Sequence, residues 1–187
     1  AALAWINSHN PQRAVVLGGG FLGLEVTENL MYRGLSVALL EQSDQVMPML
    51  DQELSVLVHR HALASGVDLR LNVQPQRIES SGPPRLRVVL HDGQVLETDL
   101  IMVTSGALPD IKLAQAANLR MGALGGLQVD THMRTSDPDI YSIGDAVETP
   151  HRVTGASMLT SLSVPLMQQA RIAAMHATGR EASYAGT

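Results

Sequence analysis

Residues 14–25 read AVVLGGGFLGLE, a short apolar run that passes through G-x-G-x-x-G into a segment with helical spacing. In a dinucleotide-binding turn Gly18 permits the tight bend, Gly20 lets backbone approach a pyrophosphate, and Gly23 lets the helix pack closely on the strand. The free N–H groups and the positive dipole end of the helix would then face the phosphates. Because any tight strand-to-helix turn recruits glycine, the triplet needs support from its surroundings.

A second apolar run, residues 36–40, supplies that support because it ends in Glu41. In a dinucleotide-binding fold an acidic residue at this place accepts hydrogen bonds from the adenosine ribose hydroxyls. The next residues, Gln42, Ser43 and Asp44, include no arginine or lysine to meet a 2′-phosphate. The sequence therefore predicts NADH in preference to NADPH. The alternative interpretation of Glu41 is a solvated carboxylate at the end of a strand.

Composition limits the class of protein. The 187 residues suffice for one good core, or for one domain and part of another. A net charge of −5 and no basic cluster argue against nucleic acid as a partner. No apolar run is long enough to cross a bilayer and no secretory signal opens the chain, so we expect no membrane association and a cytoplasmic location. Cysteine is absent, which excludes a disulfide, a thiolate metal site and a thiol nucleophile within this chain.

The order of patterns predicts an α/β fold of the Rossmann type with a parallel sheet. Strands are expected at 13–17, 36–40 and 67–73, and helices at 21–33 and, capped by Asp51, 52–65. The pattern then changes to hairpins, with strands at 77–80, 85–90 and 94–98 that form a three-stranded meander. Turns are expected at 81–84 and at 91–93, where Asp-Gly is a strong turn signal. A fully buried strand follows within 99–105.

The glycine-rich segment 122–126 predicts a domain boundary. After a short helix at 110–117, the remaining pattern comprises strands at 127–129 and 140–143 and a helix at 165–178. This remainder is too small to be an independent domain. We therefore expect one complete domain over residues 1–124 and part of a second over 125–187. Since Ala1 is not methionine and residues 1–6 read as the end of a helix, we expect the chain to be a piece of a longer protein.

Three ordered motifs carry a family resemblance: residues 18–25, SGALP at 105–109, and TSDPDIYSIGDA at 135–146. Together they resemble the pyridine nucleotide-disulfide oxidoreductases, most nearly the NADH oxidase and coenzyme A-disulfide reductase branch. The resemblance implies a flavoprotein whose FAD domain is split in sequence by an inserted NAD domain. Residues 1–124 would be the NAD(H)-binding domain and 125–187 the second half of the FAD domain. The first FAD half, with the redox cysteine, would precede this chain, and a domain that makes the intact protein a homodimer would follow it.

The resemblance also assigns residues to the FAD. In the family, the aspartate that matches Asp145 binds the ribityl and pyrophosphate region of FAD, and Gly144 makes room for it. The segment that matches Leu162 and Ser163 brings backbone N–H groups towards the flavin pyrimidine carbonyl, where a helix N-terminus stabilises the reduced flavin anion. Val164 is bulkier than the family's residue at its position, which leaves the exact subfamily open.

Four residues are assigned to the nicotinamide end of NAD. Phe21 and Leu22 match the aromatic–aliphatic pair near the nicotinamide, Glu25 matches the carboxylate that points towards nicotinamide and flavin, and Gly106 matches the glycine over which NAD passes. Each assignment has an alternative: Phe21 packed in a core, Glu25 solvated in a first helical turn, and Asp145 capping a turn.

Histidine does not predict a metal site. His59 and His61 lie two apart on a helix and so point to different faces, and the other five are scattered surface candidates: His9, His91, His132, His151 and His176.

We therefore expect the chain to be the NADH-binding part of an FAD-dependent oxidoreductase that passes hydride to flavin and then electrons to a disulfide, coenzyme A disulfide first, or to oxygen. No catalytic residue is assigned within the chain, which alone is expected to be inactive and to retain no stoichiometric FAD. Two alternatives stay open: a stand-alone NAD-binding or redox-sensing module without catalysis, and a related reductase acting on ferredoxin, rubredoxin or nitrite reductase.

Overall fold

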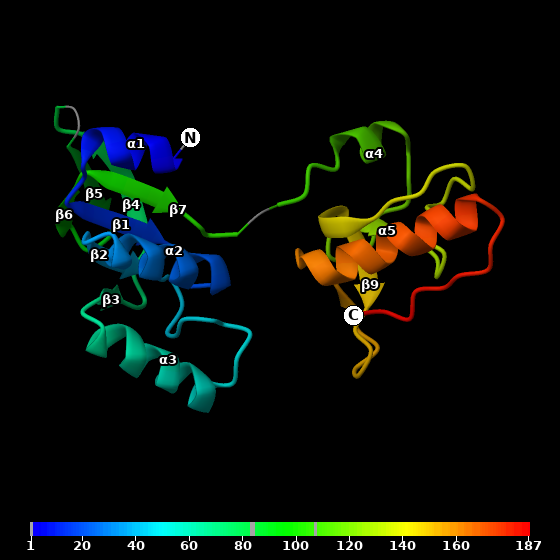
Figure 1. Ribbon diagram of the computed structural model, residues 1–187, viewed down its shortest axis with the longest axis horizontal. Helices are drawn as coiled ribbons and strands as arrows, with labels where there is room; N and C mark the ends of the chain where they lie inside the picture. The colour runs from blue at the N-terminus through cyan, green and yellow to red at the C-terminus, as the bar shows by residue number, and fades with distance from the viewer. Residues whose placement is uncertain (1, 83–84, 107) are drawn as a thin grey trace. The chain divides into compact units, whose positions relative to one another are not determined.

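The computed structural model describes residues 2–82, 85–106 and 108–187 (Figure 1). The chain forms two compact units, Ala1–Ala107 and Leu108–Thr187. Within the described residues no helix is both long enough and apolar enough to cross a membrane.

The first unit is built on a four-stranded parallel sheet in the order β3-β2-β1-β7. Its strands are β1 (Arg13–Leu17), β2 (Ser36–Leu40), β3 (Asp68–Arg70) and β7 (Leu100–Val103), and its helices are α1 (Ala2–His9), α2 (Phe21–Tyr32) and α3 (Gln52–Ala64). The predicted succession of strand, glycine turn, helix and strand is confirmed, and so is the α/β class.

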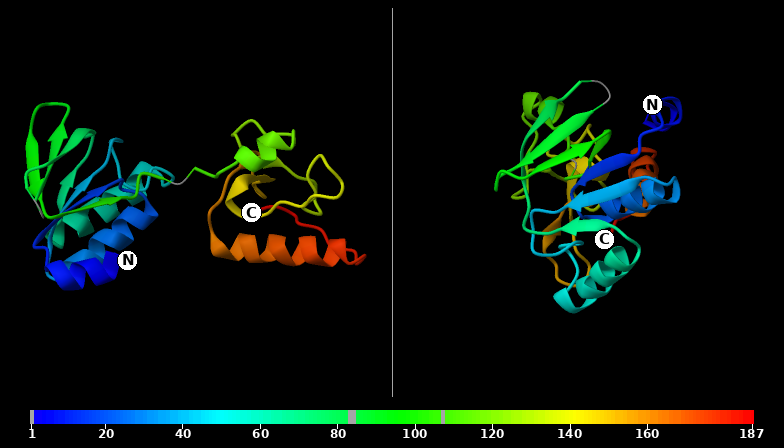
Figure 2. Two further views of the ribbon diagram at one scale, coloured as in Figure 1. Left: turned by 90° about the horizontal axis from the view of Figure 1, so that it is seen from above. Right: turned by 90° about the vertical axis from the view of Figure 1, so that its left-hand side faces the viewer.

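Alternation along β1 explains the layers. Ala14 and Val16 pack in a core with the helices, whereas Val15 and Leu17 pack on the opposite face with Val88 of the meander. A strand whose successive side chains point to opposite faces can be apolar throughout only if both faces are covered. Figure 2 shows this arrangement, with helices on one side of the sheet and the meander on the other.

The meander is antiparallel and has the order β4-β5-β6: β4 (Pro75–Ser80), β5 (Leu86–Leu90) and β6 (Val95–Thr98). The predicted Asp-Gly turn is confirmed, because Gly93 has a φ of +85° and its N–H donates to Leu90 O at 3.0 Å. Of the turn predicted at 81–84, Pro83 and Pro84 lie outside the described residues.

Three local predictions in this unit are corrected. β3 is shorter than the expected 67–73, because Asn72 turns the chain with a φ of +55°. β7 is not fully buried: it forms the edge of the sheet, and 67% of Val103 is exposed. Asp51 does occupy the N-cap of α3, but its side chain makes no capping hydrogen bond.

The second unit has a small sheet in the order β10-β9-β8: β8 (Leu127–Gln128), β9 (Val147–Pro150) and β10 (Ser157–Met158). Its helices are α4 (Lys112–Ala116), the 3₁₀ turn η1 (Gly144–Ala146) and α5 (Ser163–Ala177). The strand predicted at 140–143 is wrong, since Tyr141 forms only an isolated bridge with Arg134. β9 and β10 were not predicted, and α5 begins two residues before the expected Pro165.

The compact units divide before residue 124, because the glycine-rich segment is bonded into the second one. The Glu148 carboxylate is buried on β9 and accepts hydrogen bonds from Leu124 N at 2.7 Å and from Gly126 N at 3.1 Å. Gln128 N also donates to Arg120 O at 3.0 Å.

Candidate dinucleotide-binding site

The glycine turn, residues 18–23, comprises the link from β1 to α2 and the first residues of α2, and it contains glycines in two different situations. Gly18 has a φ of +111°, and a Cβ there would lie 2.8 Å from Thr104 O. A Cβ on Gly23 would collide with the carbonyl group of Gly18. At Gly20, by contrast, no heavy atom lies within 4 Å of the Cβ position. The protein's own packing therefore requires Gly18 and Gly23, whereas the backbone of Gly20 borders open space.

The N-terminus of α2 lies at the same turn. Gly20 is the N-cap residue and supplies no side-chain hydrogen bond, and the first helical bond runs from Leu24 N to Gly20 O at 3.0 Å. The N–H groups of the first helical turn are thus left without a capping side chain. Such a helix end attracts an anion through these donors and through the helix dipole.

Gly19, between two glycines of the pattern, is held by the protein itself. Its N–H donates to Glu41 Oε2 at 2.6 Å, and its carbonyl oxygen accepts a hydrogen bond from Met47 N at 2.9 Å. Since both polar groups of Gly19 are engaged, the donors free for a phosphate in this turn are those that follow it.

Glu41 lies at the carboxyl end of β2 and is 6% exposed. Its second oxygen, Oε1, accepts a hydrogen bond from Ser43 N at 2.8 Å. The alternative interpretation of a solvated carboxylate is therefore wrong. Glu41 ties the glycine turn to the following loop, residues 41–51, and each of its oxygens retains a second acceptor lone pair.

Two residues of α3 that sequence reasoning did not assign to the site hold this loop. Ser55 Oγ donates to Val46 O at 2.8 Å, and Val46 N donates to His59 Nε2 at 3.0 Å. A polar pair at positions i and i+4 on the buried face of a helix was the available signal. Among the described residues, no group of three or more histidine, aspartate or glutamate side chains is arranged to hold a metal ion, and His59 therefore belongs to none.

The residues expected near the nicotinamide are exposed in the first unit. Phe21 is 61% and Leu22 57% exposed, so the alternative of a packed Phe21 is wrong. Glu25 is exposed, and Gly106 has a φ of +111° with open space at its Cβ position. Thr104 Oγ1 lies 3.0 Å from both Leu17 O and Gly18 O, which joins the end of β7 to the turn.

The residues expected at the FAD lie around η1 and the start of α5. Gly144 is buried with a φ of +81°, and its N–H donates to Gln169 Oε1 at 2.7 Å. Asp145 is exposed, and within the described residues its carboxylate accepts no hydrogen bond, so nothing supports the capping alternative. Leu162 is the N-cap residue of α5 and Ser163 its first residue, again without a side-chain cap.

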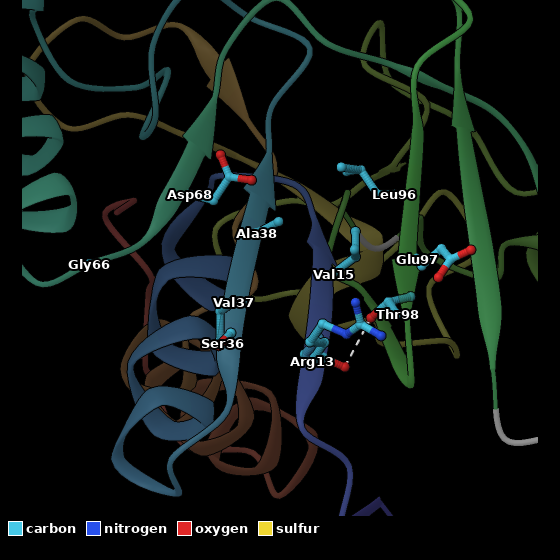
Figure 3. Close-up of a pocket in the computed structure, with 11 residues that line it drawn as sticks. Arg13, Val15, Ser36, Val37, Ala38, Gly66, Asp68, Leu96, Glu97 and Thr98 are labelled. Carbon is cyan, nitrogen blue, oxygen red and sulfur yellow. Dashed lines mark hydrogen bonds between the residues drawn. The ribbon is translucent and has the colours of Figure 1, made fainter.

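A separate hollow of about 200 Å³ lies in the first unit between the parallel sheet and the meander. Figure 3 shows Val15, Ala38 and Leu96 in this gap, beside the hydrogen bond of 2.9 Å from Thr98 Oγ1 to Arg13 O. Arg13 begins β1, whereas the glycine turn follows the other end of that strand. The hollow is therefore distinct from the candidate site.

The glycine turn combines an open glycine, an uncapped helix and an acidic residue at the end of the second strand, which is the arrangement expected of a Rossmann-type dinucleotide-binding turn. The family model for pyridine nucleotide-disulphide oxidoreductases matches residues 1–175. The chain belongs to this family.

Individual relatives agree with this assignment. A Methanocaldococcus jannaschii protein described as an NADH oxidase is 30% identical over 185 residues, 98% of this chain and 41% of that protein. The structure of an NAD-dependent persulfide reductase from A. fulgidus matches with a TM-score of 0.93 and 34% identity, over 99% of this chain and 34% of that one. Reduced Bacillus anthracis CoADR-RHD matches with a TM-score of 0.92 and 37% identity, over 98% and 33%. The chain thus spans less than half the length of the curated relatives it matches.

Proposed function

We propose that this chain binds NAD(H) at the glycine turn and prefers NADH to NADPH. The observation that carries the proposal is the contrast among the glycines: side chains are excluded at Gly18 and Gly23 by backbone, while Gly20 borders open space beside the uncapped end of α2. The pyrophosphate would lie at Gly20, where the first-turn N–H groups of α2 donate to it.

The preference for NADH rests on Glu41. Its buried carboxylate is fixed by two backbone N–H groups, and its free lone pairs would accept the ribose hydroxyls. A 2′-phosphate at the same place would meet a fixed negative charge in a weakly screened environment. Residues 42–44 supply no cation to offset that repulsion.

The nicotinamide end would extend from the turn towards Phe21, Leu22 and Glu25, with Gly106 leaving room for it. Two exposed apolar side chains beside a binding turn suit a planar ring that must be oriented without hydrogen bonds to its faces. Glu25 would carry a carboxylate close to the reacting end. These residues would orient the dinucleotide.

Residues 125–187 would contribute half of an FAD site, with residues 1–124 as the NAD domain. The fit is supported by Gly144, whose positive φ favours glycine at a tight turn, by the exposed carboxylate of Asp145, and by the uncapped α5 at Leu162 and Ser163. FAD, when bound, supplies the acceptor for the hydride of NADH. The positive end of α5 would stabilise negative charge on the pyrimidine portion.

The electron acceptor of the intact enzyme would be a disulfide or oxygen, and we place coenzyme A disulfide first. The similarity to CoADR-RHD and to a persulfide reductase supports a sulfur acceptor, and the similarity to an NADH oxidase supports oxygen. Because the 187 residues hold no cysteine, a redox thiol would come from outside them. The intact enzyme would be a homodimer.

Calorimetric titration of the 187-residue chain with NADH and with NADPH tests the binding proposal. We expect saturable binding of NADH and at least about tenfold weaker binding of NADPH, a difference of roughly 1.4 kcal/mol. Equal affinities would remove the NADH preference, and no binding of either nucleotide would remove the site.

A further inference from the structure

Two side chains of helix α3 hydrogen-bond to the backbone of one residue of the 41–51 loop, one to its N–H and the other to its carbonyl oxygen. Ser55 Oγ donates to Val46 O at 2.8 Å, Val46 N donates to His59 Nε2 at 3.0 Å, and Ser55 Oγ lies 3.2 Å from His59 Nε2. Ser55 and Val46 are fully buried. Because Ser55 and His59 are one helical turn apart, both reach the same residue of the loop.

The donors and acceptors fix the state of the imidazole. A backbone N–H can only donate, so His59 Nε2 accepts from Val46 and the ring carries its proton on Nδ1. The single hydrogen of the Ser55 hydroxyl is directed to Val46 O. The carbonyl and the N–H of a buried residue are thus both satisfied by side chains from another element.

Val46 is in direct contact with the glycine turn. Val46 Cγ1 lies 2.9 Å from the position that a Cβ on Gly19 would take. The next residue, Met47, has a φ of +49°, uncommon for a side chain other than glycine, and its N–H donates to Gly19 O at 2.9 Å. Gly19 N in turn donates to Glu41 Oε2. A continuous series of contacts therefore connects α3, through residues 46 and 47 of the loop, to Gly19 and Glu41.

We propose that Ser55 and His59 are positioning residues for recognition of the adenosine ribose. They hold Val46 and Met47 in place, and these residues hold Gly19 against the Glu41 carboxylate. The inference rests on the proposed NAD(H) site. Neither side chain is assigned a contact with the nucleotide, so their effect reaches it through the loop.

Substitution of His59 separates positioning from mere support of the fold. In His59→Ala the buried N–H of Val46 loses its acceptor, and the loop can leave Gly19. We expect the Kd for NADH to rise about tenfold and the Kd for NADPH to change less than about threefold, so that the preference between the two is largely lost. Partial unfolding alone would weaken the binding of both nucleotides by the same factor.

Two variants provide the controls. His61→Ala makes the same chemical change at an exposed position of α3 and should leave both Kd values unchanged. His59→Gln should restore NADH affinity to within about threefold, because the glutamine oxygen can accept the Val46 N–H. If His59→Ala does not fold, Ser55→Ala takes its place, with the same expected loss of preference.

A thermal midpoint that falls in His59→Ala or Ser55→Ala, with the NADH-to-NADPH ratio of Kd values unchanged, overturns the positioning role and leaves the binding proposal standing. A wild-type chain that binds no NADH overturns both. Loss of the ratio in these variants, its recovery in His59→Gln and its retention in His61→Ala establish the positioning role.

Discussion

Glu41 Oε2 accepts a hydrogen bond from Gly19 N at 2.6 Å, so the carboxylate expected to read the ribose also holds the turn expected to cradle the pyrophosphate. The two halves of the candidate site are therefore coupled by one buried group. Coupled sites of this kind predict that a single substitution changes both affinity and stability.

Glu41→Ala is expected to weaken the binding of NADH far more than the binding of NADPH. It also leaves the N–H groups of Gly19 and Ser43 without their acceptor, which should lower the free energy of unfolding by about 1–3 kcal/mol. Calorimetric titration and chemical denaturation measure the two effects. Asp44→Ala, which removes an exposed carboxylate from the same loop, is the control and should change neither. If Glu41→Ala weakens the binding of both nucleotides equally, this carboxylate does not recognise the ribose hydroxyls.

Gly20→Val is expected to abolish NADH binding while the fold persists, since the site of the new side chain is open and Gly20 has a φ of −72°. Chemical denaturation followed by circular dichroism should show a loss of less than about 1 kcal/mol in the free energy of unfolding. Gly23→Ala is the matched comparison, because its added methyl would collide with Gly18 O, and it should damage the fold itself. An unchanged NADH affinity in Gly20→Val would remove the pyrophosphate from this turn.

Asp99 predicts a dependence of stability on acidity. Its carboxylate accepts hydrogen bonds from Gln12 N at 2.9 Å and Arg13 N at 3.0 Å, and the bond from Gln12 is the main cause that lowers the pKa of Asp99, against the opposing effect of desolvation. A lowered pKa in the folded state stabilises the fold above the ordinary aspartate value. That contribution is lost as pH falls through the lowered value, below about pH 4.

Chemical denaturation between neutral and strongly acidic pH measures this contribution. Asp99→Asn should be less stable than wild type at neutral pH and should lose less stability on acidification. Glu97→Gln, an exposed carboxylate on β6, is the control and should behave as wild type. Parallel acid profiles for wild type and Asp99→Asn would contradict the assignment.

The stability of the second unit is expected to depend on Gln169. It is fully buried, its Oε1 accepts from Gly144 N at 2.7 Å, and its Nε2 has no partner within the described residues. Gln169→Leu leaves the Gly144 N–H unpaired, so unfolding of this unit should become easier by about 1–3 kcal/mol. The neighbouring Gln168 is exposed, and Gln168→Leu should have no comparable effect in hydrogen exchange at Gly144. Equal exchange in both variants would deny Gln169 this role.

Sequence predicted the elements whose patterns are local. The strand, glycine turn and helix at 13–32, and the Asp-Gly hairpin, were predicted because spacing and glycine chemistry alone determine them. β8 and β10 contain two residues each, too few for a period, and only β8 was predicted. The edge position of β7 is set by the order of strands in the sheet, and apolar composition does not reveal that order.

Sequence predicted the candidate site less completely than the fold. Glu41 was identified by its position after a strand, but its bonds to Gly19 and Ser43 exist only once the loop has folded back. The sequence pattern around His59 indicates no metal site and no other role, because its partner Val46 lies 13 residues away and has no polar side chain to indicate the contact. Hydrogen bonds from side chain to distant backbone leave no periodic pattern in a sequence.

Crystals of this chain soaked with NADH test most directly whether the turn at residues 18–23 receives the pyrophosphate of the nucleotide. We expect the pyrophosphate at Gly20 and the first-turn N–H groups of α2, with the adenosine ribose beside Glu41. Electron density for the nucleotide at another surface, with the space beside Gly20 still open, would contradict it.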